Sequence, residues 1–281
     1  MDDKVLYAIP TMKCNLNCDH CFIVDTPEEF NRDKFISKLN NFNGEIILFG
    51  GEITSNRERM NDVIKTNKMD GISRISSIST NLIILDSELI EFYKTLHHVS
   101  TSWNPHRFKY GSMFDKWLAN CYRLSRSKIN HTVMITLTND LFEISPNEFI
   151  KIAKLFDNEY LLEIKFEHYV GEVTKEYFEK ADLWLCEVYK LWDLNTKFEI
   201  GDRICSWQYN CDNIYTLYPD GSLVNRCPHN LPGTTPVECY TCDRVKTCRP
   251  CKLQPYCSYP KHLAELIKGG GSDGLSLLSS Q

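Results

Sequence analysis

Residues 5–21 read VLYAIPTMKCNLNCDHC, and residues 45–52 read EIILFGGE. Each stretch opens with a short apolar run that is typical of a buried strand. Three cysteines follow the first run, and a glycine pair with Glu52 follows the second. The two stretches therefore predict two buried strands, each followed by a chemically distinctive loop.

The alternation of strand-like and helix-like segments continues to residue 192. Strands are expected over 5–10, 45–49, 75–79, 99–103, 131–137 and 161–166, and helices over 27–42, 57–68, 87–96, 113–124, 146–156 and 175–192. Repeated strand–helix units imply a parallel sheet with helices outside it. Because there is no Rossmann glycine fingerprint, the six units predict an α/β fold, namely a partial (β/α)6 TIM-like barrel. Its chemistry is expected at the C-terminal ends of the strands.

The composition excludes several classes of protein. With 42% hydrophobic and 25% charged residues among 281, the chain can bury a core and is not disordered as a whole. The net charge of −5 argues against a basic surface for nucleic acid. No apolar run approaches the roughly 20 residues that span a membrane, and the first residues lack the pattern of a secretory signal. Neither a nucleic acid nor a membrane is expected as a partner.

The 13 cysteines are clustered along the chain. Three lie within residues 14–21, eight lie within residues 205–257, and only Cys121 and Cys186 fall between them. The count is odd, the chain is not small and no export signal is expected. These features favour the reducing cytoplasm, where clustered thiols indicate metal or redox chemistry.

The composition shifts near residue 200 and predicts three parts: a barrel over 1–200, a small cysteine-rich domain over 201–262 and a flexible tail over 263–281. The tail contains Gly-Gly-Gly-Ser at 269–272, which is a linker composition. It reads either as native disorder or as a linker with an appended peptide.

Cys14, Cys18 and Cys21 have the spacing C-x3-C-x2-C in the loop after the first strand. Three thiolates this close can share one metal cluster, and three ligands on a four-iron cluster leave one iron open to a small molecule. A redox disulfide within the loop is one alternative. A zinc site with His20 as its fourth ligand is another.

The cysteine motif and Gly50-Gly51-Glu52 together resemble the radical S-adenosylmethionine (SAM) superfamily, with His20 at the aromatic position of the motif. The resemblance covers residues 4–200 in the order of elements. It implies that His20 and the Gly50-Gly51-Glu52 motif belong to a SAM site, the latter at the methionine amino group. It also suggests SAM contacts from polar residues near the ends of later strands, for which ordinary strand-end hydrogen bonding is the alternative. These residues are Thr80, Asn81, Ser100, Ser102, Thr136 and Thr138.

The resemblance also implies a mechanism. The open iron would chelate the amino and carboxylate groups of SAM, and one electron from the reduced cluster would cleave the sulfur–C5′ bond. The resulting 5′-deoxyadenosyl radical would abstract a hydrogen atom from substrate, while the protein positions the reactants and excludes water. The electron would come from a reductant such as flavodoxin or ferredoxin.

The eight later cysteines are enough for two four-cysteine clusters, and their order resembles the SPASM extension of radical SAM enzymes. That resemblance implies two auxiliary [4Fe-4S] clusters, three clusters in all, with Gly221 in a hairpin. By order, the first would use Cys205, Cys211, Cys227 and Cys251, and the second Cys239, Cys242, Cys248 and Cys257. Two spacings depart from the pattern by one residue, which leaves these assignments open. A four-thiolate zinc site and a one-cluster twitch domain are the alternatives.

Five further residues are candidates for catalysis: Cys121, Cys186, Glu167, His168 and Asp212. Some radical SAM epimerases return a hydrogen atom from a thiol, which would suit Cys121 or Cys186; buried packing is the alternative. Glu167 and His168 near the end of the sixth strand would handle a substrate proton, unless they form a solvated strand end. Asp212 lies near the auxiliary region, where a base is sometimes found.

Three functions follow from these patterns. The first is a radical SAM oxidoreductase that oxidises, cross-links or epimerises a ribosomally synthesised peptide or a protein residue. Because the barrel begins almost at Met1, leader recognition would then need a separate leader-binding protein or the barrel surface. The second is a dehydrogenase or epimerase of a sugar or another small metabolite. The third is a non-catalytic iron–sulfur or zinc module.

Overall fold

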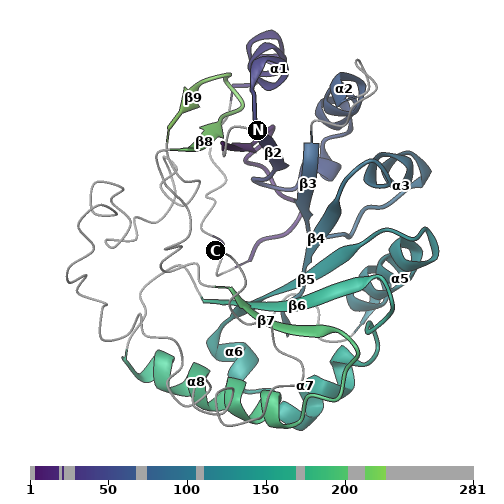
Figure 1. Ribbon diagram of the computed structural model, residues 1–281, viewed down its shortest axis with the longest axis vertical. Helices are drawn as coiled ribbons and strands as arrows, with labels where there is room; N and C mark the ends of the chain where they lie inside the picture. The colour runs from purple at the N-terminus through teal and green to yellow at the C-terminus, as the bar shows by residue number, and fades with distance from the viewer. Residues whose placement is uncertain are drawn as a thin grey trace.

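The computed structural model describes residues 4–18, 21, 29–67, 75–105, 111–168, 175–201 and 213–225. They form one nine-stranded sheet in the order β7-β6-β5-β4-β3-β2-β1-β8-β9. All neighbouring strands are parallel except β8 and β9, which are antiparallel. Figure 1 shows the helices in an arc outside the strands. The predicted α/β fold with a parallel sheet and outer helices is confirmed.

The strands are β1 Val5–Ala8, β2 Glu45–Leu48, β3 Ile75–Thr80, β4 His98–Ser102, β5 His131–Leu137, β6 Leu161–His168, β7 Lys197–Gly201, β8 Ile214–Leu217 and β9 Leu223–Val224. The helices are α1 Arg32–Asn41, α2 Arg57–Asn67, α3 Ser87–Tyr93, α5 Ser112–Arg126, α6 Asn139–Phe142, α7 Pro146–Ala153 and α8 Lys175–Lys190, and a 3-10 turn η1 covers Ile53–Ser55. All six predicted strands and six predicted helices are present; β5 has its predicted bounds, and the others are shifted at one end or both. No described helix is long and apolar enough to cross a membrane.

The structure differs from the prediction at the start of the first helix and in an additional strand, β7. The first helix begins at Arg32, later than predicted, because the Asn31 side chain caps it by accepting from the Lys34 amide at 3.2 Å. Strand β7 was missed because charged residues occupy alternate positions of its short sequence. Lys197 and Glu199 form an ion pair at 2.8 Å, while Phe198 and Ile200, which alternate with them, are buried.

Strands β8 and β9 confirm the predicted hairpin around Gly221, which has a φ of +80°. The Ser222 amide and hydroxyl donate to the Asp220 carboxylate at 2.9 and 2.6 Å, which fixes the turn. Strand β8 pairs with β1, on the side opposite β2, and the Asn31 amide donates to the Pro219 carbonyl at 3.0 Å. The sheet therefore continues past residue 200, beside α1 (Figure 1).

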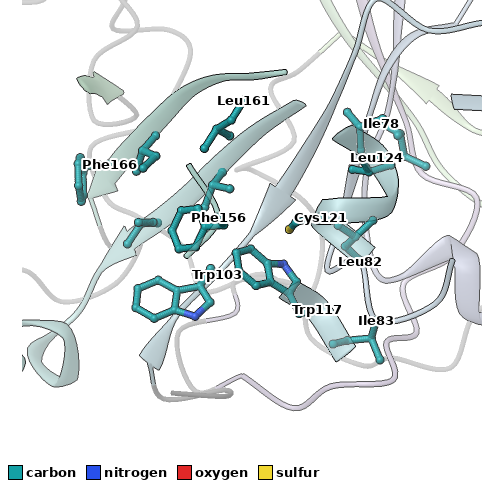
Figure 2. Close-up of a cluster of buried hydrophobic side chains, with 14 of the residues drawn as sticks. Ile78, Leu82, Ile83, Trp103, Trp117, Cys121, Leu124, Phe156, Leu161 and Phe166 are labelled. Carbon is teal, nitrogen blue, oxygen red and sulfur yellow. The ribbon is translucent and has the colours of Figure 1, made fainter. Parts of the chain in front are cut away.

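The core between sheet and helices is rich in aromatic side chains. Trp103, Trp117 and Phe156 are fully buried, and Trp117 meets Phe156 edge-on with ring centroids 5.2 Å apart. Figure 2 shows this cluster with Cys121 of α5 beside Trp117. Such rings bury large apolar areas, so this cluster stabilises the packing of helices on the sheet.

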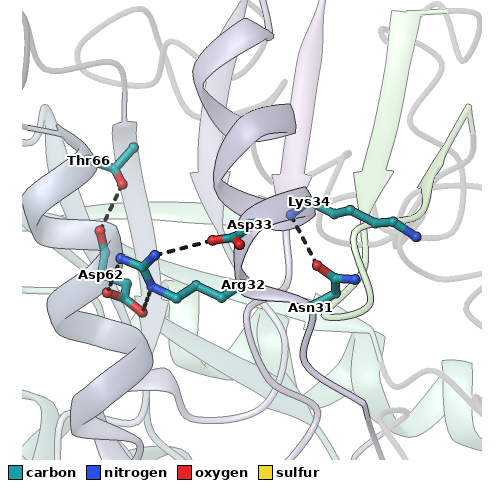
Figure 3. Close-up of polar contacts among 6 residues, drawn as sticks. All are labelled: Asn31, Arg32, Asp33, Lys34, Asp62 and Thr66. Atoms are coloured by element: carbon teal, nitrogen blue, oxygen red, sulfur yellow. Dashed lines mark hydrogen bonds and ion pairs between the residues drawn. The ribbon is translucent and has the colours of Figure 1, made fainter.

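A polar contact joins the first two helices at the surface. Arg32 of α1 donates to both carboxylate oxygens of Asp62 in α2, at 2.8 and 2.9 Å (Figure 3). Thr66 donates to the Asp62 carbonyl at 2.8 Å. Because Arg32 is exposed, this bidentate pair orients the helices more than it stabilises them.

Candidate active site at the cysteine loop

The loop that contains the first three cysteines is hydrogen-bonded to the residues directly after β2. The amides of Gly51 and Glu52 donate to the carbonyls of Thr11 and Lys13 at 2.9 and 2.8 Å. The pairing of β1 with β2 thus extends beyond both strands. It places Cys14 next to the glycine pair, at the C-terminal edge of the sheet.

The glycine pair permits this close approach. A Cβ on Gly51 would lie 2.1 Å from the Lys13 carbonyl oxygen, and one on Gly50 would lie 2.5 Å from Ile9 Cγ2. Gly50 also has a φ of +122°, which L side chains rarely adopt. These residues therefore position the cysteine loop, and their predicted contact with SAM stays a prediction.

Glu52 is only 2% exposed, and its carboxylate is engaged inside the protein. Oε1 accepts hydrogen bonds from the hydroxyls of Thr54 and Thr80, at 2.6 and 2.9 Å, and from the Thr54 amide at 3.3 Å. Oε2 accepts from the Asn81 amide at 2.6 Å. Burial raises the pKa of Glu52, and these hydrogen bonds oppose the rise. The carboxylate thus joins the ends of β2 and β3, in addition to whatever contact with SAM it makes.

Asn81 connects this buried carboxylate to the cysteine loop. Its side-chain Nδ2 donates to Asn15 Oδ1 at 2.7 Å and to Cys14 Sγ at 3.8 Å. Its Oδ1 accepts from the Ile83 amide at 3.1 Å. The sequence singled out Asn81 as a SAM contact, and the structure shows these contacts with the cysteine loop.

The three cysteines of the loop are not joined in a disulfide. Cys14 and Cys21 are exposed and Cys18 is half-buried; the Cys21 amide donates to the Cys18 carbonyl at 2.9 Å. Among the described residues, no three His, Cys, Asp or Glu side chains already converge on a metal position. Three soft sulfur ligands on one short loop still fit an iron–sulfur cluster, since metal binding itself deprotonates such ligands and commonly draws them together.

Polar residues from the next strands lie at the same edge of the sheet. Ser102 at the end of β4 pairs with Met134, two positions before Thr136, and Thr136 pairs with Glu167 of β6, so these residues lie toward the C-terminal ends of neighbouring strands. Ser100 pairs with Ser79 and Thr132 and lies further back along the strands. Thr138 accepts from the Leu141 amide at 3.4 Å and caps α6, while its predicted contact with SAM stays a prediction. Glu167 is buried, and His168 ends β6 with its side chain outside the described set.

Two buried asparagines near this edge were missed from the sequence. Asn104 follows β4 and donates to the Thr136 carbonyl at 2.9 Å. Asn120 of α5 donates to the Leu82 carbonyl at 2.8 Å and supports the segment after β3. Asn120 could have been found from the sequence, because it is a polar residue at a position where the amphipathic pattern of the helix predicts a buried apolar one.

Cys121 and Cys186 lie in helices α5 and α8 and belong to the hydrophobic core. Burial raises the pKa of the Cys121 thiol well above its usual range and that of Cys186 to about 11. Both thiols are therefore protonated near neutral pH and pack as small apolar groups, as the packing alternative expected.

Several predicted site residues lie outside the described residues. They are His20, Asp212, Cys205, Cys211, Cys227, Cys239, Cys242, Cys248, Cys251 and Cys257, together with the tail over 263–281.

The described site combines a three-cysteine loop without a disulfide and a strand end that carries two glycines, at the C-terminal edge of a parallel α/β sheet. No protein-family model matches the chain, and no curated protein sequence does. Solved structures with a similar fold are found.

Two crystal structures of Streptococcus suis SuiB are similar to the chain at 13% identity. The one bound to S-adenosylmethionine has a TM-score of 0.59 over 82% of this chain and 62% of SuiB. The one bound to the precursor peptide SuiA has a TM-score of 0.58 over 91% and 66%. The chain thus spans about two thirds or less of the length of these SuiB chains.

The native enzyme anSMEcpe with bound AdoMet and Cp18Cys peptide is also similar, at 16% identity. Its TM-score is 0.59, over 81% of this chain and 75% of that chain. At these identities the likeness establishes the shared α/β fold.

Proposed function

We propose that this chain is a radical SAM enzyme. The observation that carries the proposal is that backbone hydrogen bonds hold the loop of Cys14, Cys18 and Cys21 against Gly51 and Glu52, at the C-terminal edge of the parallel sheet. The fold is shared with SuiB and anSMEcpe, which both have structures with bound SAM.

Three cysteines of the chain would hold the cluster at this site. Cys14, Cys18 and Cys21 would hold a [4Fe-4S] cluster, with the loop amides and the glycine pair fixing their position. When bound, the cluster supplies the electron that cleaves SAM to a 5′-deoxyadenosyl radical.

Polar groups at the strand ends would bind SAM and exclude water from it. The hydroxyls of Ser100, Ser102 and Thr136 would form hydrogen bonds with the polar groups of SAM. Further contacts would come from Thr138, Asn81, Glu52 and His20. Glu167 and His168 lie at the end of β6 and would handle a substrate proton.

We infer that the substrate is a ribosomally synthesised peptide or a protein residue, which the enzyme oxidises, cross-links or epimerises. SuiB has a structure with its precursor peptide SuiA, and anSMEcpe has one with the Cp18Cys peptide, which supports this choice. Flavodoxin or ferredoxin would supply the electron in the cytoplasm, and either a separate leader-binding protein or the barrel surface would bind the leader of the peptide.

The C-terminal cysteines would add two auxiliary clusters in a SPASM-type domain over 201–262. Cys205, Cys211, Cys227 and Cys251 would hold one, and Cys239, Cys242, Cys248 and Cys257 the other. The barrel over 1–200 would hold the SAM site.

The test measures iron and 5′-deoxyadenosine after anaerobic reconstitution of the wild type and of a C14A/C18A/C21A variant. We expect about 12 iron atoms per chain to fall to about 8 in the variant, and 5′-deoxyadenosine formation under reducing conditions to be lost. Cys121→Ala serves as the matched control and keeps the full iron content. Equal iron in wild type and triple variant, or no SAM cleavage by the wild type, would overturn the proposal.

A further inference from the structure

We propose that Asn81 is a positioning residue that raises the reduction potential of the cluster held by Cys14. It would act by donating a side-chain N–H hydrogen bond to the Cys14 sulfur. This inference rests on the proposed function, and it gives Asn81 a role separate from any contact with SAM.

The contacts of Asn81 fix which end of its amide faces the sulfur. The Ile83 amide donates to Oδ1 at 3.1 Å, so the opposite end of the side chain is the NH₂ group. That group carries two hydrogens; one is directed to Asn15 Oδ1 at 2.7 Å and the other to Cys14 Sγ at 3.8 Å. Asn81 is only 5% exposed, which limits competition from water.

The backbone of Asn81 is held equally firmly. Its amide donates to Glu52 Oε2 at 2.6 Å, and the other oxygen of that carboxylate is bound by Thr54 and Thr80. The network therefore runs from a buried carboxylate through Asn81 to the thiol. Burying the Glu52 carboxylate costs desolvation free energy, and the hydrogen bonds of this network offset that cost.

The Cys14 sulfur receives a second donor from the Leu16 amide at 3.4 Å. Hydrogen bonds to ligand sulfurs are one of the protein's controls over cluster potential. Reduction adds one negative charge to a cluster, and a donor at the sulfur favours that more negative state. Loss of the Asn81 donor should therefore make the cluster harder to reduce.

The experiment is a potentiometric titration of the reconstituted full chain, followed by electron paramagnetic resonance and performed without SAM. The signal of interest is the one that disappears in the C14A/C18A/C21A variant. Asn81→Leu should shift the reduction equilibrium about tenfold toward the oxidised cluster, which is about 59 mV for a one-electron couple. Asn81→Asp at pH 8 keeps the shape and the acceptor for Ile83, and should shift it further because of its charge.

Asn120→Leu is the matched control. Asn120 is buried to the same degree, 4% exposed, and donates to Leu82 in the segment directly after Asn81, but no described contact joins it to Cys14. Its potential should equal that of the wild type. If Asn81→Leu assembles no cluster, Asn81→Asp supplies the measurement.

Unchanged potentials in both Asn81 variants, or an equal shift in Asn120→Leu, would overturn this inference and leave the radical SAM proposal intact. A wild type without a cluster on Cys14, Cys18 and Cys21 would overturn both. Because SAM is absent, a lost contact between Asn81 and SAM cannot produce the expected shift.

Discussion

The two halves of the sheet share one apolar core but differ in what is added to it. Around β1, β2 and β3, backbone pairs and a buried polar network fix the strand ends and the cysteine loop. Around β4 to β7, packed aromatic rings join strands to helices. Aromatic burial stabilises without strict direction, whereas hydrogen bonds contribute little net stability but define geometry. The polar half is therefore suited to position reactive groups.

The aromatic half is dense where β6 and β7 meet the outer helices. Phe166 lies 5.6 Å from Phe149, 6.0 Å from Trp184 and 5.0 Å from Phe198, measured between ring centroids. Trp192 meets Phe198 edge-on at 4.9 Å. These contacts provide stability to the scaffold on which the polar half depends.

The largest expected effect is in the aromatic half. Phe149→Ala removes a fully buried ring that contacts Trp184 at 5.1 Å, and should lower the free energy of unfolding by about 3–5 kcal/mol. Denaturant unfolding measures it. Leu183→Ala, at a position 60% exposed, is the control and should stay within about 0.5 kcal/mol of wild type. A small loss in Phe149→Ala would show that the aromatic half is not the main source of stability.

The glycine pair gives the next prediction. Gly50→Ala and Gly111→Ala both place a side chain at positive φ, +122° and +106°, which costs about 1–3 kcal/mol. Only at Gly50 does the new Cβ also meet neighbours, so it should lose about 1–3 kcal/mol more.

Unfolding free energy and reconstituted iron should be measured for both glycine variants. Iron should fall in Gly50→Ala only, because only that variant pushes the cysteine loop away from β2. Equal losses of stability and iron would contradict the role of close approach.

Glu52→Gln tests the polar network and its pH dependence. Both carboxyl oxygens accept hydrogen bonds, and each can still accept when one carries a proton, whereas the amide nitrogen accepts none, so at least one hydrogen bond is lost, at about 1–3 kcal/mol. Because the folded pKa of Glu52 lies above the ordinary value of 4.5, the folded chain keeps a proton that the unfolded chain has released. The stability due to this group is therefore complete at low pH and decreases as pH rises above 4.5.

The difference in unfolding free energy between wild type and Glu52→Gln should thus shrink as pH rises from 4 to 8, since glutamine does not titrate. Denaturant unfolding at several pH values measures it. Parallel curves would mean that burial does not raise the pKa of Glu52.

The smallest expected effect is at the surface of the polar half. Arg32→Ala removes the bidentate contact with Asp62 between α1 and α2, whose arginine is exposed. The thermal midpoint should fall slightly at low salt and match wild type at high salt, because salt screens such pairs. A decrease that persists at high salt would show that this contact does more than orient the helices.

The regular elements could be predicted because their periodicity is local. His131–Leu137 coincides with β5, and Arg57, Ser87, Pro146 and Lys175 begin their helices as expected. Strand β7 was missed since its alternating Lys-Phe-Glu-Ile pattern is short. The pairing of β8 with β1 could not be predicted, because it joins residues about 200 positions apart.

The sequence by itself determined the α/β class, the cysteine loop after β1 and the glycine pair after β2. These depend on spacing and on local propensity. Only the tertiary structure decided that Glu52 is buried, that the glycine pair receives the backbone of the cysteine loop and that Asn81 faces Cys14. Those contacts join the ends of three strands, and their partners are set by how the strands align in the sheet.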